Sequence, residues 1–96
     1  MNYKPLPNSL TIKKSNIQGL GLFAVKTIAK NTDLGMIHFS YGELLIRTPL
    51  GGFINHSLKP NCKKLDLDQE WHLKTLIDIK KDEELTLKYT MYNPEL

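Results

Sequence analysis

The stretch Gly51–Cys62, GGFINHSLKPNC, concentrates the chemistry that this sequence offers. Its two glycines allow backbone conformations that other residues avoid, and the two apolar residues after them predict a short buried strand. That strand ends in Asn55–Ser57, an amide, an imidazole and a hydroxyl side by side, and Pro60–Asn61 then predicts a turn. Polar groups directly after a buried strand either satisfy neighbouring backbone groups or hold a ligand, and this stretch alone leaves both interpretations open.

The composition is that of one small globular domain. The chain has 96 residues, of which 41% are hydrophobic and 24% charged, which is ordinary for a soluble protein. A chain of this length buries only a thin core, and a second copy could supplement it, so we expect a homodimer. Thirteen basic against ten acidic residues give a net charge of +3, too small to indicate nucleic acid as a partner.

The remaining bulk features point to the cytoplasm. Met1–Leu10 holds two prolines and lacks the apolar segment of a signal peptide. No stretch approaches the roughly 20 apolar residues that cross a bilayer. The single cysteine, Cys62, has no partner for a disulfide or for a multi-thiolate zinc site, which fits a reducing compartment. We therefore expect a soluble, cytoplasmic protein with no membrane segment.

Short apolar or alternating runs predict a mostly β fold with little helix. The predicted strands are Leu10–Lys13, Leu22–Val25, Leu34–Phe39, Leu44–Arg47, Trp71–Ile79 and Glu84–Tyr89. Alternation is clearest in the last two, whose predicted buried faces are Trp71, Leu73, Thr75, Ile77 and Ile79, and then Leu85, Leu87 and Tyr89. Nowhere does an apolar 3.6-residue period persist for three turns, so no long helix is predicted.

Three separated segments have to be considered together: Gly19–Ala24 (GLGLFA), Phe53–Cys62 and Glu84–Tyr89 (ELTLKY). The first is no dinucleotide fingerprint, because the third glycine and the following helix are missing. In this order and spacing the three resemble the motifs of the SET domain family, lysine methyltransferases that use S-adenosylmethionine. The resemblance is greatest to the smallest viral and bacterial members. It divides the chain into a lead-in (residues 1–9), a minimal SET domain (10–89) and a short tail (90–96) that has no cysteine-rich segment.

The resemblance implies a SET-domain β-clip fold of small curved sheets with a knot-like C-terminal crossing. In such a fold Glu84–Tyr89 is tucked through a loop beside Asn55–His56. The cofactor, S-adenosyl-L-methionine, binds on one face of the crossing. A protein or peptide substrate presents its lysine on the other face, and a narrow channel joins the two.

The same resemblance implies roles for individual residues. Gly19, Leu20 and Gly21 would approach the methionine end of the cofactor through backbone groups. Asn55 would hydrogen-bond the amino-acid portion, and His56 would serve the adenine edge mainly through its backbone; bonding neighbouring strands is the structural alternative for both.

Three tyrosines complete the site that the resemblance implies. Tyr89 would be the catalytic pocket tyrosine beside the reacting groups, although its strand parity alone also fits a core residue. Tyr41 is a candidate for the second channel tyrosine, although Tyr41-Gly42 does not reproduce the family's Tyr-x-Gly spacing. Tyr92 is either an aromatic lid over the cofactor or a surface residue.

The sequence departs from the family at three places. Lys88 replaces the acidic or amide residue that usually precedes the pocket tyrosine. Met36–Leu50 is much shorter than the insert that usually builds one wall of the peptide groove. Cys62 stands where relatives place a zinc ligand, but the tail has no cysteine and His38, His56 and His72 show no ligand spacing, so no metal is expected.

These features predict methyl transfer from S-adenosylmethionine to a lysine of a protein substrate. The alternative is a reduced SET-fold module that holds the cofactor or a partner protein without turnover, which the shortened insert and Lys88 favour. A small basic β-module for nucleic acid ranks last, because it needs exposed aromatics among its lysines and most aromatics lie in predicted strands.

Overall fold

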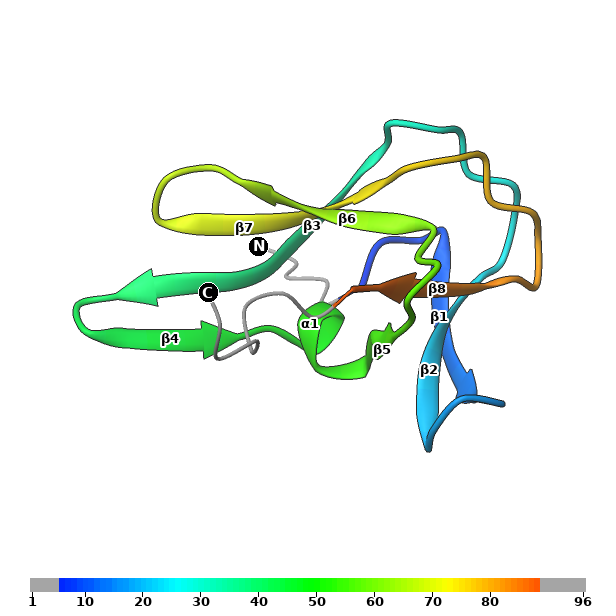
Figure 1. The fold of residues 1–96 in the computed structure, drawn as a ribbon, viewed down its shortest axis with the longest axis horizontal. Coiled ribbons are helices and arrows are strands. Elements are labelled where there is room, and N and C mark those ends of the chain that lie inside the picture. The colour runs from blue at the N-terminus through cyan, green and yellow to red at the C-terminus, as the bar shows by residue number, and fades with distance from the viewer. Residues whose placement is uncertain (1–5, 89–96) are drawn as a thin grey trace.

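The computed structural model describes residues 6–88, which form two four-stranded sheets and one short helix (Figure 1). One sheet has the order β1-β2-β8-β5 and consists of β1 (Leu10–Lys14), β2 (Leu20–Ala24), β8 (Glu84–Leu87) and β5 (Asn55–His56). The other has the order β4-β3-β7-β6 and consists of β4 (Leu44–Arg47), β3 (Asp33–Tyr41), β7 (Glu70–Thr75) and β6 (Cys62–Asp66). The predicted mostly β architecture with little helix is confirmed.

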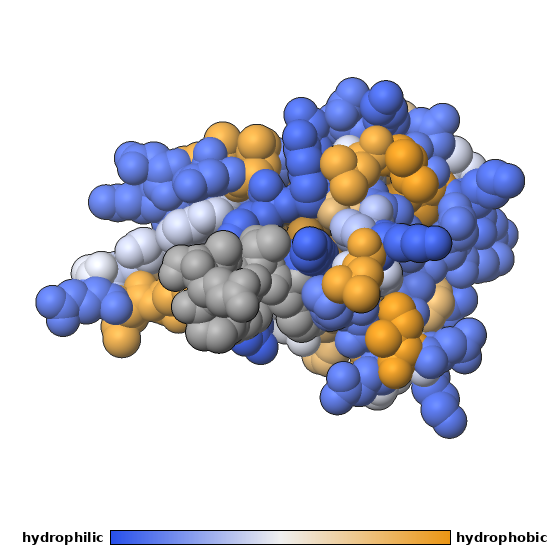
Figure 2. Space-filling model, in the orientation of Figure 1, coloured by the Kyte–Doolittle hydropathy of each residue, from blue (hydrophilic) through white to orange (hydrophobic). Residues whose placement is uncertain are grey.

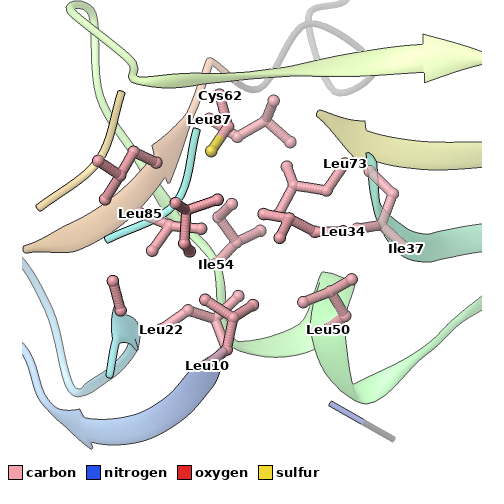
Figure 3. Close-up of a cluster of buried hydrophobic side chains, with 13 residues drawn as sticks. Leu10, Leu22, Leu34, Ile37, Leu50, Ile54, Cys62, Leu73, Leu85 and Leu87 are labelled. Carbon is pink, nitrogen blue, oxygen red and sulfur yellow. The ribbon is translucent and has the colours of Figure 1, made fainter. Parts of the chain in front are cut away.

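A hydrophobic core joins the two sheets (Figure 3). Four strands each contribute one side chain that is 0% exposed: β2 contributes Leu22, β3 Ile37, β7 Leu73 and β8 Leu85. Burial of each such side chain contributes about 1.5–3 kcal/mol. Ile54, 2% exposed, belongs to the same cluster and anchors the chain directly before Asn55.

The strand β8 lies inside its sheet, between β2 and β5. It pairs antiparallel with β2 through Leu22 and Leu85, and parallel with β5 through Asn55 and Thr86. Because β8 has a neighbour on each side, Thr86 is buried (8% exposed) as well as Leu85 and Leu87 on the opposite parity.

The loop after β5 closes over β8 through one side chain. Asn61 Oδ1 accepts the backbone N–H of Thr86 at 2.8 Å, and Asn61 Nδ2 donates to the carbonyl oxygen of Glu84 at 2.9 Å. The backbone N–H of Ser57 donates to Leu87 O at 3.1 Å. Segments that are far apart in the sequence are therefore held at one crossing, as Figure 1 shows for β2, β5 and β8.

The segment before Asn55 is a helix, not the buried strand that its apolar residues predicted. Thr48 caps α1 (Pro49–Phe53) by accepting the N–H of Gly51 at 3.3 Å, and Pro49 supplies a fixed φ at the first turn. A Cβ on Gly51 would overlap the carbonyl oxygen of Ile37. The glycine is therefore needed for close packing of α1 on β3.

The predicted strand Trp71–Ile79 is also corrected, because β7 ends at Thr75. The N–H of Leu76 still bonds Asn61 O beside β6, whereas Ile79 pairs with Ile28 on another segment. The bend between these two partners turns Ile77 outward, where it is 56% exposed rather than buried. The strand β6 was not predicted, because its only buried side chain is that of Cys62. No helix among residues 6–88 combines the length and the apolar character that crossing a bilayer requires.

Candidate functional site

Asn55 lies at the crossing and joins it to the loop before β2. Its Nδ2 is 2.8 Å from Glu84 Oε2, 3.1 Å from Gln18 O and 3.2 Å from Leu20 O. These contacts are of the structural kind that the sequence left open for Asn55. All the hydrogen bonds that its side chain makes within residues 6–88 use Nδ2, so Oδ1 remains as an acceptor for a ligand donor.

Glu84 is the acidic centre of the site, and sequence reasoning missed it. Its carboxylate accepts from Ser15 Oγ at 2.8 and 2.9 Å as well as from Asn55 Nδ2. Ser15 Oγ in turn accepts the backbone N–H groups of Ile17 at 2.8 Å and Gln18 at 3.3 Å. The network therefore ties the loop before β2 to the start of β8.

The two glycines of the first motif are needed for different physical reasons. Gly19 has a φ of +49°, in the left-handed region that favours glycine, and a Cβ there would meet nothing within 4 Å. A Cβ on Gly21 would instead overlap the carboxylate of Glu84 and come within 3.1 Å of Asn55 Nδ2. The space above Gly21 is thus taken by a side chain of this protein, and only Gly19 presents an open backbone.

An open depression of about 380 Å³ lies over this network. Its walls come from the loop before β2, from α1 and from the start of β5, and they are Gln18, Gly19, Leu20, Gly52, Phe53, Ile54 and Asn55. Three of the residues singled out from the sequence, Gly19, Leu20 and Asn55, therefore share one concave surface.

Comparison with known families decides what this arrangement is. The SET domain model matches residues 38–90, more than half of the 96-residue chain. The chain belongs to the SET domain family. The first motif, Gly19–Ala24, lies outside the matched range, but its strand β2 pairs with β8 inside that range.

Two solved structures share the SET fold of this chain. A Plasmodium falciparum protein assigned as a histone methyltransferase is 20% identical, with a TM-score of 0.74 over 94% of this chain and 99% of that one. The methyltransferase domain of human PR domain-containing protein 2 is 21% identical, with a TM-score of 0.71 over 95% of this chain and 84% of that one. At these identities the likeness establishes the fold. No curated protein sequence matches the chain significantly.

His56 and Tyr41, which the SET resemblance also singled out, do not line the depression. His56 follows Asn55 in β5 and is exposed, and its backbone pairs with Leu87 of β8. Tyr41 ends β3, is 71% exposed, and belongs to the β3–β4 hairpin that extends away from β1 and β2 (Figure 1). The structure therefore does not bring Tyr41 to Asn55. Tyr89 and Tyr92 lie outside the described residues.

A second depression of about 240 Å³ lies on the β6 side of β8, lined by Pro60, Cys62, Lys63, Lys64, Leu76, Leu87 and Lys88. Three lysines in one lining disfavour a cationic ligand there, because like charges repel. Cys62 is buried, and burial raises the pKa of its thiol to about 12. A neutral, buried thiol is a poor nucleophile and metal ligand, and no group of three or more metal-ligating side chains occurs within residues 6–88.

Two histidines outside the depression titrate abnormally. His38 on β3 is 5% exposed, and neither ring nitrogen has a hydrogen-bond partner among residues 6–88. Burial, reinforced by the charges of Arg47 and Lys64, lowers the pKa of His38. Burial also acts to lower the pKa of His72, but hydrogen bonds and charge from Glu70 and Asp33 outweigh it, so that pKa is raised.

Proposed function

We propose that this SET domain transfers a methyl group from S-adenosylmethionine to the side chain of a lysine in a protein substrate. The observation that carries the proposal is the depression over the crossing, where Gly19, Leu20 and Asn55 line one concavity beside the carboxylate of Glu84. Membership of the family supports the reaction type, and the names of the two structural neighbours support a protein substrate.

The residues present fit an S-adenosylmethionine ligand. Asn55 Oδ1 is an acceptor, which suits the ammonium of the cofactor's amino-acid portion better than its carboxylate. The open backbone at Gly19 permits close approach of a ligand, and the nearby carboxylate of Glu84 favours a cationic one. The cofactor supplies an activated methyl group on a sulfonium.

The chain's own contribution to this chemistry is positioning and desolvation. Holding two reactants in line contributes about 7–11 kcal/mol to lowering a barrier. A lysine with a reference pKa of about 10.4 must lose its proton before it attacks, and an apolar channel disfavours its charged form. No general-base carboxylate is therefore required. We assign the pocket role to Tyr89 and a contact with the adenine portion to the backbone of His56.

A labelled-methyl assay on mixed lysine peptides tests the proposal. Wild type should incorporate label, Asn55→Ala should lose most incorporation through weaker cofactor binding, and Tyr89→Phe should lower turnover with cofactor binding retained. Asn16→Ala is the matched control, because Asn16 is an exposed asparagine in the same loop region as Gln18. Equal incorporation by Asn55→Ala and Asn16→Ala would contradict the role of Asn55.

A second candidate function is a SET-fold module that binds without turnover. It is favoured by the segment between β3 and β5, which holds only β4 and the five-residue α1 and so offers little to build a groove wall. Titration calorimetry with S-adenosylmethionine shows whether the domain binds the cofactor. The labelled-methyl assay then separates the two functions, because a module that binds S-adenosylmethionine leaves every peptide unmethylated.

A further inference from the structure

The strand β4 differs from the other sheet edges in being apolar and free of lysine. Among residues 6–88 the edge strands are β1, β5, β4 and β6. Lysines on an edge discourage pairing with another chain, and β1 and β6 carry two each, whereas β5 has only two residues. β4 reads Leu-Leu-Ile-Arg, and Leu44 and Leu45 are 63% and 51% exposed although they point to opposite faces.

Figure 1 draws β4 at the outer margin of its sheet, and Figure 2 shows hydrophobic surface along β4, next to the hydrophilic tip of the β3–β4 hairpin. Tyr41, opposite Leu44 in the hairpin, is 71% exposed and extends this surface. An exposed hydrophobic edge strand is a template for pairing with another strand. We therefore expect β4 to pair with a strand of another chain.

The backbone groups of β4 alternate in a way that leaves Leu45 available. The N–H of Thr48 donates to Ile37 O on β3 at 2.9 Å, and the N–H of Ser40, which is opposite Leu45, points to Gln69 O instead of to β4. Because successive residues of a strand direct their N–H and C=O groups to opposite sides, Leu45 directs both outward.

The sequence around Leu45 is complementary to itself. When two copies of Glu43–Arg47 (ELLIR) run antiparallel about Leu45, each Glu43 faces Arg47 of the other copy, and each Leu44 faces Ile46. The same register makes Leu45 face Leu45 as a pair that exchanges both backbone hydrogen bonds, and it places the opposite charges on the same face as Leu45. Arg47 has five donors, so it can donate to this carboxylate in addition to its contact within its own chain.

We propose that β4 pairs antiparallel with β4 of a second copy about a two-fold axis at Leu45, joining the two outer sheets into one continuous sheet. The charge pattern selects the occupant, because an arbitrary strand would not place an acid against Arg47 and a base against Glu43 at once. Opposite charges and apolar pairs across two strands each contribute about 0.2–1 kcal/mol.

Mass measurement by light scattering and a matched cysteine pair test this interface. The protein should have twice its 11.0 kDa chain mass. Leu45→Lys should return it to the chain mass, whereas Leu58→Lys, at a 78% exposed leucine outside β4, should not. A wild type that stays at 11.0 kDa up to millimolar concentration would overturn the proposal.

The cysteine pair tests the register. At a two-fold hydrogen-bonded pair the Cα atoms lie about 5.5 Å apart, within disulfide reach, so Leu45→Cys should cross-link under mild oxidation. Leu44→Cys places the new thiol opposite Ile46 of the other copy. The Cα atoms of the two residues at position 44 then lie more than about 7 Å apart, so this variant should not cross-link. Equal cross-linking of both variants, or of neither in a protein of twice the chain mass, would overturn the register.

A charge exchange gives an independent readout. Glu43→Arg alone places like charges opposite each other at both ends and should weaken the dimer, and Glu43→Arg with Arg47→Glu should restore it. A double variant that is folded by circular dichroism but no more dimeric than Glu43→Arg would contradict the pairing.

Discussion

Asn55 Nδ2 lies 2.8 Å from Glu84 Oε2 although the two residues are 29 positions apart. The bond joins the second and third of the three family motifs directly, because Asn55 begins β5 and Glu84 begins β8. Ser15 reaches the same carboxylate from the loop before β2. One acidic side chain therefore ties together the loop before β2, the start of β5 and the start of β8.

The network predicts non-additive effects on stability. Glu84→Gln replaces one acceptor oxygen with a donor, and Ser15→Ala removes the hydroxyl that donates to Glu84. Each should cost about 1–3 kcal/mol in the free energy of unfolding, because a partly buried polar group is left unsatisfied. Together they should cost less than the sum, because they share one interaction. Chemical denaturation of the wild type, the two single variants and the double variant measures the four free energies of unfolding that this comparison needs. Ser15→Ala with His72→Asn, which share no contact, is the control that should be additive.

Two adjacent glycines of α1 give a matched pair. Gly51→Ala should destabilise the fold by about 1–3 kcal/mol, since its Cβ overlaps the backbone of Ile37 and packed β3 cannot move freely. Gly52→Ala should be tolerated, because its nearest neighbour is Arg47 Cδ at 3.7 Å. Thermal unfolding of both variants checks this; equal melting temperatures would contradict the tight packing of α1 on β3.

His72 predicts a pH-dependent contribution to stability. Its Nδ1 is 2.9 Å from Asp33 Oδ1 and its Nε2 is 2.8 Å from Glu70 Oε1, and its pKa in the fold is raised above the usual 6.5. Stabilisation from a raised pKa is fully present below the unfolded value and is lost as the pH rises through the folded value. His72→Asn should therefore lose more stability at about pH 5 than at about pH 8. A loss that does not change with pH would contradict the ion pairs.

His38 predicts the opposite dependence. The pKa of its buried imidazole is lowered from 6.5. As the pH drops, the unfolded chain therefore binds a proton at His38 before the folded protein does, and the free energy of unfolding falls. His38→Leu should be more stable than wild type, with a gain that grows from about pH 8 to about pH 5. Urea denaturation at both values measures it. A gain that shrinks in acid would show that His38 is protonated favourably in the fold.

Several strands were predictable from the sequence because their signal is local. The alternation in Leu10–Lys13 and the apolar run in Leu44–Arg47 each need only a few neighbouring residues, and the two segments form β1 and β4. The helix α1 also had a local signal, Thr48 followed by Pro49, the N-cap and first-turn pair. It was obscured by two glycines and by the helix's length of one turn.

The acidic centre of the site had no such signal. Ser15 and Glu84 are 69 residues apart, and nothing near either one reveals a partner at that distance. Gly19, Leu20 and Asn55, which the family resemblance singled out, line one concave surface. The resemblance explained Gly21 by the close approach of the cofactor to the backbone. In the structure, the missing Cβ of Gly21 makes room for the carboxylate of Glu84.

We expect S-adenosylmethionine to bind in the depression over the crossing. The most direct measurement is an amide nuclear magnetic resonance titration of isotope-labelled protein with S-adenosylmethionine. We expect the largest shifts at the backbone amides of Gly19 and Leu20 and at the side-chain amide of Asn55. Spectra that do not change at millimolar ligand, or shifts confined to the lysine-lined depression beside Cys62, would contradict the account.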